Sequence, residues 1–86
     1  MKVNYHDVER AYTATQGQYL AFIYYYTKPH GVPPAEADMQ RYFKVSPPAV
    51  HNMIVTLEKH GFIKRTPGVG RSIQFLLDRD QLPDLE

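Results

Sequence analysis

The sequence predicts a mainly α-helical domain that ends in a small β-hairpin. Residues 13–61 contain three stretches with apolar side chains at helical spacing, separated by short segments with Pro or Gly or by a tight turn. Two β-prone runs, residues 62–66 and 72–77, follow with a Pro- and Gly-rich turn between them. The short connections indicate one compact unit.

Length and composition agree with one small domain. The chain has 86 residues, no Cys and a net charge of +1. We expect a domain over residues 13–77, an N-terminal extension over 1–12 and an acidic tail over 78–86. Without Cys, neither disulfides nor thiolate metal sites are available, which suits the reducing cytoplasm. No apolar run approaches the roughly 20 residues of a membrane span, so no membrane partner is expected.

The first helix is expected to run from the Thr13 cap to about Lys28. Thr13 and Gln16 match a capping box, in which the hydroxyl accepts from the amide three residues on and the Gln side chain reaches back. Pro29 and Gly31 then stop the helix, because Pro lacks a donor and Gly permits the turn. The predicted inward face consists of Tyr19, Leu20, Ile23, Tyr26 and Thr27.

A short second helix is expected over residues 35–43, with Pro34 at its first helical position. Acidic residues open this helix and Arg41 closes it, as the helix dipole favours. Its buried side is predicted to consist of Ala35, Met39 and Phe43. A tight turn at Lys44 and Val45 leads into the third helix.

The third helix is predicted to begin at Ser46 as N-cap, with Pro47 in the first helical position, and to end at Gly61 in the left-handed conformation. Its buried residues are expected to be Val50, Met53, Ile54 and Leu57. Two short helices joined by a tight turn form a helix-turn-helix unit.

The hairpin is predicted to pair residues 62–66 with residues 72–77 around the turn at 67–70. Alternation along the strands places Ile63, Ile73 and Phe75 inward, over the helices. The same alternation places Lys64, Thr66 and Gln74 outward. A helix-turn-helix followed by such a hairpin is a three-helix winged helix-turn-helix, and residues 62–77 are its wing.

Positive charge is concentrated in the third helix and the wing. Residues 41–71 hold six Lys or Arg side chains and one Glu, whereas the segments on both sides of this range have more acids than bases. Winged helices read a duplex by placing a helix in the major groove while a basic hairpin reaches phosphates alongside. The distribution therefore predicts double-stranded DNA as a partner.

Residues 13–76 resemble the amino-terminal DNA-binding domain of the LexA repressor family. The resemblance is carried by the Thr13 and Gln16 cap, the connector at residues 31–34, Ser46-Pro47 with Ala49, the run at 59–63, and Gly68 with Arg71 and Ile73. It implies a winged helix-turn-helix with the third helix in the major groove and the wing on the DNA backbone. It also implies a bacterial-type, sequence-specific transcription regulator, with repression favoured, that is nucleoid-associated when bound to DNA.

The resemblance also implies which residues of the third helix face bases and phosphates: Ser46, Pro48, Ala49, His51 and Asn52. Asn52 is the best candidate base reader, because its amide can bond N6 and N7 of adenine together. Ala49 could contact a thymine methyl, and His51 could donate to a phosphate or guanine. Ser46 is expected to act mainly as the N-cap of the helix. Pro48, His51 and Asn52 depart from the usual pattern of the family, so the LexA operator is not the expected target.

In the wing, Arg71 is the strongest candidate for a DNA contact. Lys64 and Arg65 would follow the DNA backbone as charges. As strand neighbours these two should face opposite sides, so that only one of them is expected to reach DNA.

No catalytic or metal-binding arrangement is recognisable in the sequence. The four His residues fall in different elements, and none forms the i, i+4 pair with Glu that is typical of a zinc helix. The turn from Gly68 to Arg71 lacks the Lys-Ser/Thr of a phosphate-binding loop. We expect no enzyme activity, no metal, no cofactor and no small-molecule ligand.

Two further expectations concern assembly and alternative functions. LexA repressors also carry a carboxy-terminal Ser-Lys domain that cuts its own linker and dimerises the protein. The sequence ends before such a domain, so we expect no self-cleavage. We also expect that a homodimer or a contact with a partner protein would use another part of the chain. The near-neutral charge, Pro48 and the tyrosine-rich first helix leave open a protein-interaction module. A phage or plasmid protein that modulates a larger repressor is a third possibility.

Overall fold

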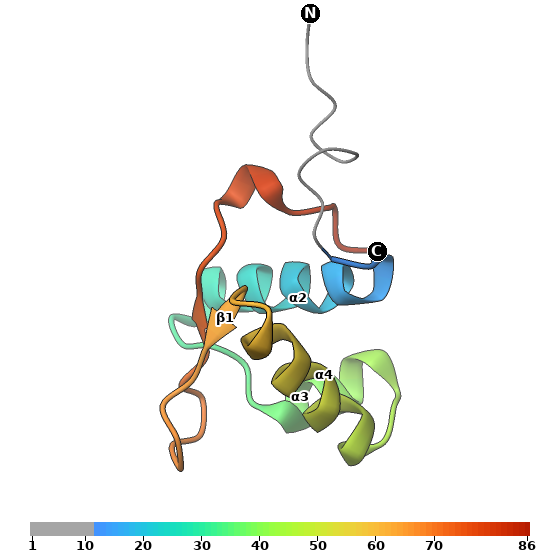
Figure 1. The fold of residues 1–86 in the computed structure, drawn as a ribbon, viewed down its shortest axis with the longest axis vertical. Coiled ribbons are helices and arrows are strands. Elements are labelled where there is room, and N and C mark those ends of the chain that lie inside the picture. Colours follow the sequence, from blue (N-terminus) through green and yellow to red (C-terminus); the bar gives the residue numbers. More distant parts are fainter. Residues whose placement is uncertain (1–11) are drawn as a thin grey trace, which may run out of the picture.

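The computed structural model describes residues 12–86 and confirms the predicted fold class. Within this range it contains three α-helices, a two-stranded antiparallel sheet and a short 3-10 helix (Figure 1). The elements in chain order are α2 (Ala14–His30), α3 (Glu36–Phe43), α4 (Pro47–Lys59), β1 (Ile63–Lys64), β2 (Gln74–Phe75) and η1 (Arg79–Gln81). The predicted extension over residues 1–12 lies outside the described residues except for Tyr12.

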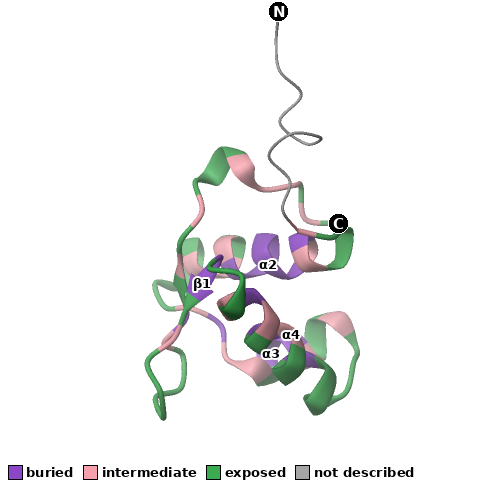
Figure 2. Ribbon diagram, in the orientation of Figure 1, coloured by how far each residue is buried: buried purple, intermediate pink, exposed green. Residues whose placement is uncertain are grey.

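The core lies where α2 crosses the α3–α4 pair and meets β1 (Figure 2). Its buried side chains are Tyr19, Leu20, Phe22, Ile23, Met39, Val50, Ile54, Leu57, Phe62, Ile63 and Ile73. The predicted inward residues of the third helix are all buried except Met53, which is half-buried. Phe22 was missed, because a single amphipathic stripe does not describe α2. Its ring packs 4.6 Å from that of Tyr42 on α3, on a second covered side of the helix.

The prediction for the end of the first helix was wrong by two residues. The helix continues through Pro29 to His30 and ends at Gly31, whose φ is 74° and whose N–H donates to the Thr27 carbonyl. A proline in the last turn removes only one donor there, so the left-handed glycine decides where the helix stops. The predicted Thr13 and Gln16 capping box is present at the other end of α2.

The helix-turn-helix forms as predicted, with one shift at the start of its first helix. Pro34 precedes the helix and Ala35 is the N-cap, whose N–H donates to the Asp38 carboxylate at 2.8 Å. Lys44, with φ 57°, makes the tight turn. Ser46 then caps α4 by accepting from the Ala49 N–H at 3.3 Å.

The hairpin is present, but its strands are shorter than predicted. Ile63 pairs with Phe75 and Lys64 pairs with Gln74, and regular pairing ends there. Beyond Lys64 the backbone N–H groups donate to side chains instead of to the opposite strand. The Arg65 N–H donates to the Glu58 carboxylate at 3.1 Å. In the same way, the Thr66 N–H bonds the Ser72 hydroxyl at 3.0 Å. The predicted alternation holds, with Ile63, Ile73 and Phe75 inward and Lys64, Thr66 and Gln74 exposed.

The segment over residues 78–86 returns across α2 and ends near its first turns (Figure 1). The Gln18 side chain donates to the Asp84 carbonyl at 2.9 Å and accepts from the Glu86 N–H at 2.8 Å. Leu82 and Leu85 pack against the core. This covering adds apolar burial to α2. No helix within residues 12–86 is long and apolar enough to cross a membrane.

Gly61 sets the exit of the chain from α4, and its replacement gives a clean test. Its φ is 80°, and a Cβ added there would meet no atom within 4 Å. Gly61→Ala should therefore cost about 1–2 kcal/mol through backbone strain alone. Gly70→Ala, also in open space but without a positive φ, is the control and should leave stability unchanged or slightly raised. Urea unfolding of both variants checks this; equal midpoints would contradict it.

Candidate nucleic-acid interface

The first turns of α4 present an exposed face opposite the core. The five predicted helix residues, Ser46, Pro48, Ala49, His51 and Asn52, are all exposed. Val50 and Ile54, between and after them, are fully buried. This separation follows from the helical period, because positions 48, 51, 52 and 55 fall on one side. The structure therefore brings the predicted helix residues together on one surface.

Two exposed apolar side chains extend this surface and were missed in the sequence. Val45, in the turn before α4, is 38% exposed, and Val55, one helical turn after His51, is 39% exposed. The spacing of Val55 from His51 and Asn52 could have identified it. Apolar side chains at such places can contact the methyl group of thymine.

His51 has an acidic neighbour from the preceding helix. Its Nδ1 lies 3.3 Å from Oε2 of Glu36, in the first turn of α3. Both side chains are partly exposed, so the pair contributes little to folding. It does place a carboxylate at the edge of the surface that was expected to face DNA.

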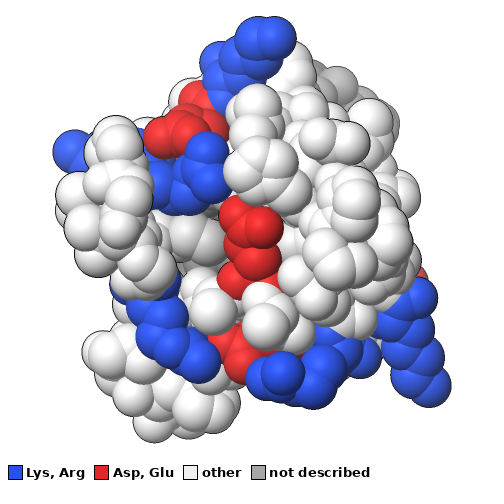
Figure 3. Space-filling view, turned by 90° about the horizontal axis from the view of Figure 1, so that it is seen from below, with Lys and Arg blue, Asp and Glu red and all other residues white. Residues whose placement is uncertain are grey.

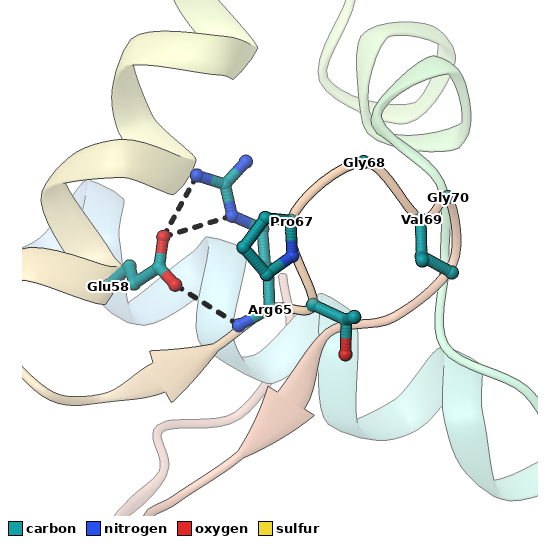
Figure 4. Close-up of a pocket in the computed structure, with 7 residues that line it drawn as sticks. Glu58, Arg65, Pro67, Gly68, Val69 and Gly70 are labelled. Atoms are coloured by element: carbon teal, nitrogen blue, oxygen red, sulfur yellow. Dashed lines mark hydrogen bonds and ion pairs between the residues drawn. The ribbon is translucent and has the colours of Figure 1, made fainter.

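Arg65 is held between the carboxylates of Glu58, which Figure 4 shows, and of Glu36. Its Nε and Nη2 donate to Oε1 of Glu58 at 3.1 and 2.9 Å, and its Nη1 lies 3.6 Å from Oε2 of Glu36. The Arg65 side-chain and backbone hydrogen bonds hold the pKa of Glu58 below its ordinary value. Lys64, its strand neighbour, is exposed while Arg65 is half-buried, so the two side chains differ as alternation requires.

Arg71 turns toward the body of the protein. Its Nη1 donates to Oδ2 of Asp38 at 3.0 Å, to the Tyr26 hydroxyl at 3.2 Å and to the Pro33 carbonyl at 3.4 Å. The Tyr26 hydrogen bond, together with the Asp38 charge, raises the pKa of Arg71. The sequence predicted a DNA contact for Arg71, and the structure joins its side chain to α2, to α3 and to the connector between them.

Asp38 is the buried centre of this contact. Its side chain is 9% exposed and also accepts from Arg41 at 2.6 Å. The Ala35 N–H bond is the largest cause that lowers the pKa of Asp38, and the Arg71 and Arg41 charges add to it against the effect of burial. No candidate role for Asp38 was predicted, because its partner on the wing lies 33 residues away in the chain.

Charge on this side of the molecule is mixed. Seen from below, acidic side chains lie along the middle with Lys and Arg around them (Figure 3). Within residues 12–86, no acid lies within ion-pair distance of Lys44, Lys59 or Lys64. The positive charge available to phosphates is therefore smaller than the count over residues 41–71 indicated, and lysines supply much of it.

A hollow of about 390 Å³ separates the wing loop, residues 65–73, from the end of α4 (Figure 4). Its lining residues are Glu58, Arg65, Thr66, Pro67, Gly68, Val69 and Gly70. The hydrogen-bonded Glu58–Arg65 pair lines the hollow where the loop leaves α4. Past this pair the hollow lies between the loop and α4. No group of three or more His, Asp or Glu side chains in the part of the chain that the structure describes could hold a metal ion.

Comparison with known proteins agrees with this geometry. Residues 9–72 match the family model described as the LexA DNA binding domain. The LexA repressor of Thermosipho melanesiensis is 33% identical over 70 residues, which cover 81% of this chain and 35% of that protein. The LexA repressor of Thermosipho africanus is 36% identical over 64 residues, which cover 74% and 32%. The chain spans about a third of the length of these relatives, and it belongs to the LexA DNA-binding domain family.

Proposed function

We propose that this chain is a sequence-specific binder of double-stranded DNA that acts in a transcriptional repressor. The observation that carries the proposal is the exposed face at the start of α4, capped by Ser46 and flanked by the wing. Membership of the family supports it, and so does the name repressor borne by both relatives. A regulator of this kind works in the cytoplasm, on the nucleoid, and needs no catalytic group.

In this proposal α4 lies in the major groove. Asn52 reads a base, because its exposed amide can bond adenine at two atoms. Ala49 lies one turn before Asn52 and contacts a thymine methyl, while His51 donates to a phosphate or a guanine. Ser46 keeps its capping bond to the Ala49 N–H, and because Pro47 and Pro48 carry no N–H, the start of α4 offers no free helix amide to a phosphate.

The DNA backbone is contacted by lysines more than by arginines. Lys64 on the outer side of β1 is exposed and free of acidic partners among the described residues. Lys44 flanks the start of α4 and Lys59 its end. Arg65 reaches a phosphate only in competition with Glu36 and Glu58, which already bind its guanidinium.

A single module of this size has a footprint of roughly 600–1,000 Å² on DNA, which limits its affinity. We therefore propose that two copies bind two half-sites together. The contact between them lies outside α4 and the wing loop, since those elements face DNA.

Selection of bound duplexes from a random pool tests the proposal. We expect the pool to converge on a site, and a two-fold symmetric consensus would report a dimer, because half-site spacing mirrors protein symmetry. A chain with His51→Ala and Asn52→Ala, selected in parallel, should lose or alter part of that consensus. No enrichment with a folded chain would contradict the proposal and favour a protein-interaction role.

A further inference from the structure

The wing loop (residues 65–73) is tied to the helices at both of its ends. At its start, Arg65 makes three hydrogen bonds to the Glu58 carboxylate on α4. At its end, Arg71 reaches past the loop to Tyr26 on α2, Pro33 in the connector and Asp38 on α3. Between these two points the loop residues 67–70 are exposed. The position of the loop therefore depends on two arginine contacts.

The Arg71 contact at the end of the loop also involves an unfavourable backbone conformation. Arg71 has φ 52°, a conformation that costs a non-glycine residue free energy. Such a conformation persists where surrounding contacts hold it. Here the guanidinium is held by a buried carboxylate, a hydroxyl and a carbonyl from three separate segments.

Asp38 links this contact to the helix-turn-helix. One of its oxygens, Oδ2, accepts both from the Ala35 N–H that starts α3 and from Arg71 of the wing. The other, Oδ1, accepts from Arg41 at 2.6 Å. The side chain is nearly buried, so it is poorly placed to meet a ligand directly. It joins the wing to the helix pair that carries α4.

We propose that Arg71 is a positioning residue, which sets the wing against α3 through Asp38 rather than binding a phosphate itself. The inference rests on the proposed binding of duplex DNA. It predicts the direction in which DNA affinity changes when Asp38 is replaced. Removing the negative charge of Asp38 should weaken DNA binding, although removal of an acid near a polyanion ordinarily strengthens it.

The first test needs no DNA and therefore stands apart from the proposed function. Amide hydrogen exchange of the free chain is measured for Thr66 and Val69, whose N–H groups bond within the wing loop. Arg71→Ala and Asp38→Asn should both speed exchange there, while Tyr26→Phe, which removes one acceptor of Arg71 and no charge, should do so more weakly. Unchanged exchange in Arg71→Ala would overturn the inference even if DNA binding is later confirmed.

The second test measures affinity for a selected duplex. Arg71→Ala and Asp38→Asn should each weaken binding on the order of 3- to 30-fold, and the double variant should be no weaker than Arg71→Ala alone. Glu36→Gln is the control: this acid also lies in the first turn of α3 but does not touch Arg71, and its removal should leave binding unchanged or tighter. Thermal unfolding of each variant confirms that the measured chains are folded.

Opposite signs would overturn the inference. If Arg71→Ala weakens binding, lowers the salt slope by about 0.9 and Asp38→Asn strengthens binding, Arg71 binds a phosphate and Asp38 only competes for it. If neither variant changes affinity, the wing does not contribute through this contact. A wild-type chain that binds no duplex would contradict the proposed function. In that case the hydrogen-exchange measurement alone tests whether Arg71 positions the wing.

Discussion

Ile54→Ala should destabilise the domain more than any substitution on its surface, by about 2–5 kcal/mol. Ile54 is fully buried in α4, in the cluster that joins this helix to α2 and β1. Folded domains are stable by only about 5–15 kcal/mol, so a large part of the stability would be lost. Thermal unfolding followed by circular dichroism should show a fall in Tm of roughly 4–8 °C for each kcal/mol lost.

The control for this substitution is the next residue in the chain. Val55 is also β-branched and lies on the same helix, but it is 39% exposed. Val55→Ala should change stability by no more than about 0.5 kcal/mol. Equal losses at Ile54 and Val55 would mean that the face of α4 assigned to the core is wrong, and the assigned DNA face with it.

Asn52→Ala should have the largest effect on recognition. Loss of a two-atom contact with adenine removes about 1–3 kcal/mol of discrimination, which is roughly a 5- to 150-fold loss of affinity for the selected site. Binding to unrelated duplexes should hardly change, because the amide carries no charge. Within residues 12–86 the Asn52 side chain has no hydrogen bond that the substitution would break, so folding should be unaffected.

Lys64→Ala separates this effect from a general loss of charge. A lysine on a phosphate contributes equally to all sequences, so this variant should weaken every duplex alike and reduce the salt slope by about 0.9. Fluorescence anisotropy with the selected duplex and a scrambled duplex measures both variants. If Asn52→Ala weakened the two duplexes by the same factor, Asn52 would not be a base reader.

The helices and the exposed face of α4 were predictable because they depend on local signals. Ser46, Pro47 and Gly61 mark both ends of α4, and the helical period separates its buried face from its exposed one. The cap at Thr13 is equally local. For these elements, residues that are close in the sequence are also close in space, so the sequence pattern is sufficient to predict them.

The partners of the wing arginines could not be predicted in the same way. Arg71 and Asp38 lie 33 residues apart, and no spacing rule connects them. The carboxylates that neutralise Arg65 come from α3 and α4, so a charge count along the chain assigned Glu36 to a different region from the arginine that it faces. The return of residues 78–86 over α2 also depends on contacts between distant residues, such as that of Gln18 with Asp84.

We expect this chain to bind duplex DNA through α4 and the wing. The most direct measurement is a titration of labelled duplex with the 86-residue chain at about 50 mM and about 200 mM salt. We predict saturable binding whose affinity falls steeply between the two, because Lys44, Lys59 and Lys64 release counterions from the phosphates. Absence of saturable binding to any duplex at low salt and micromolar protein, with the chain folded, would contradict the claim.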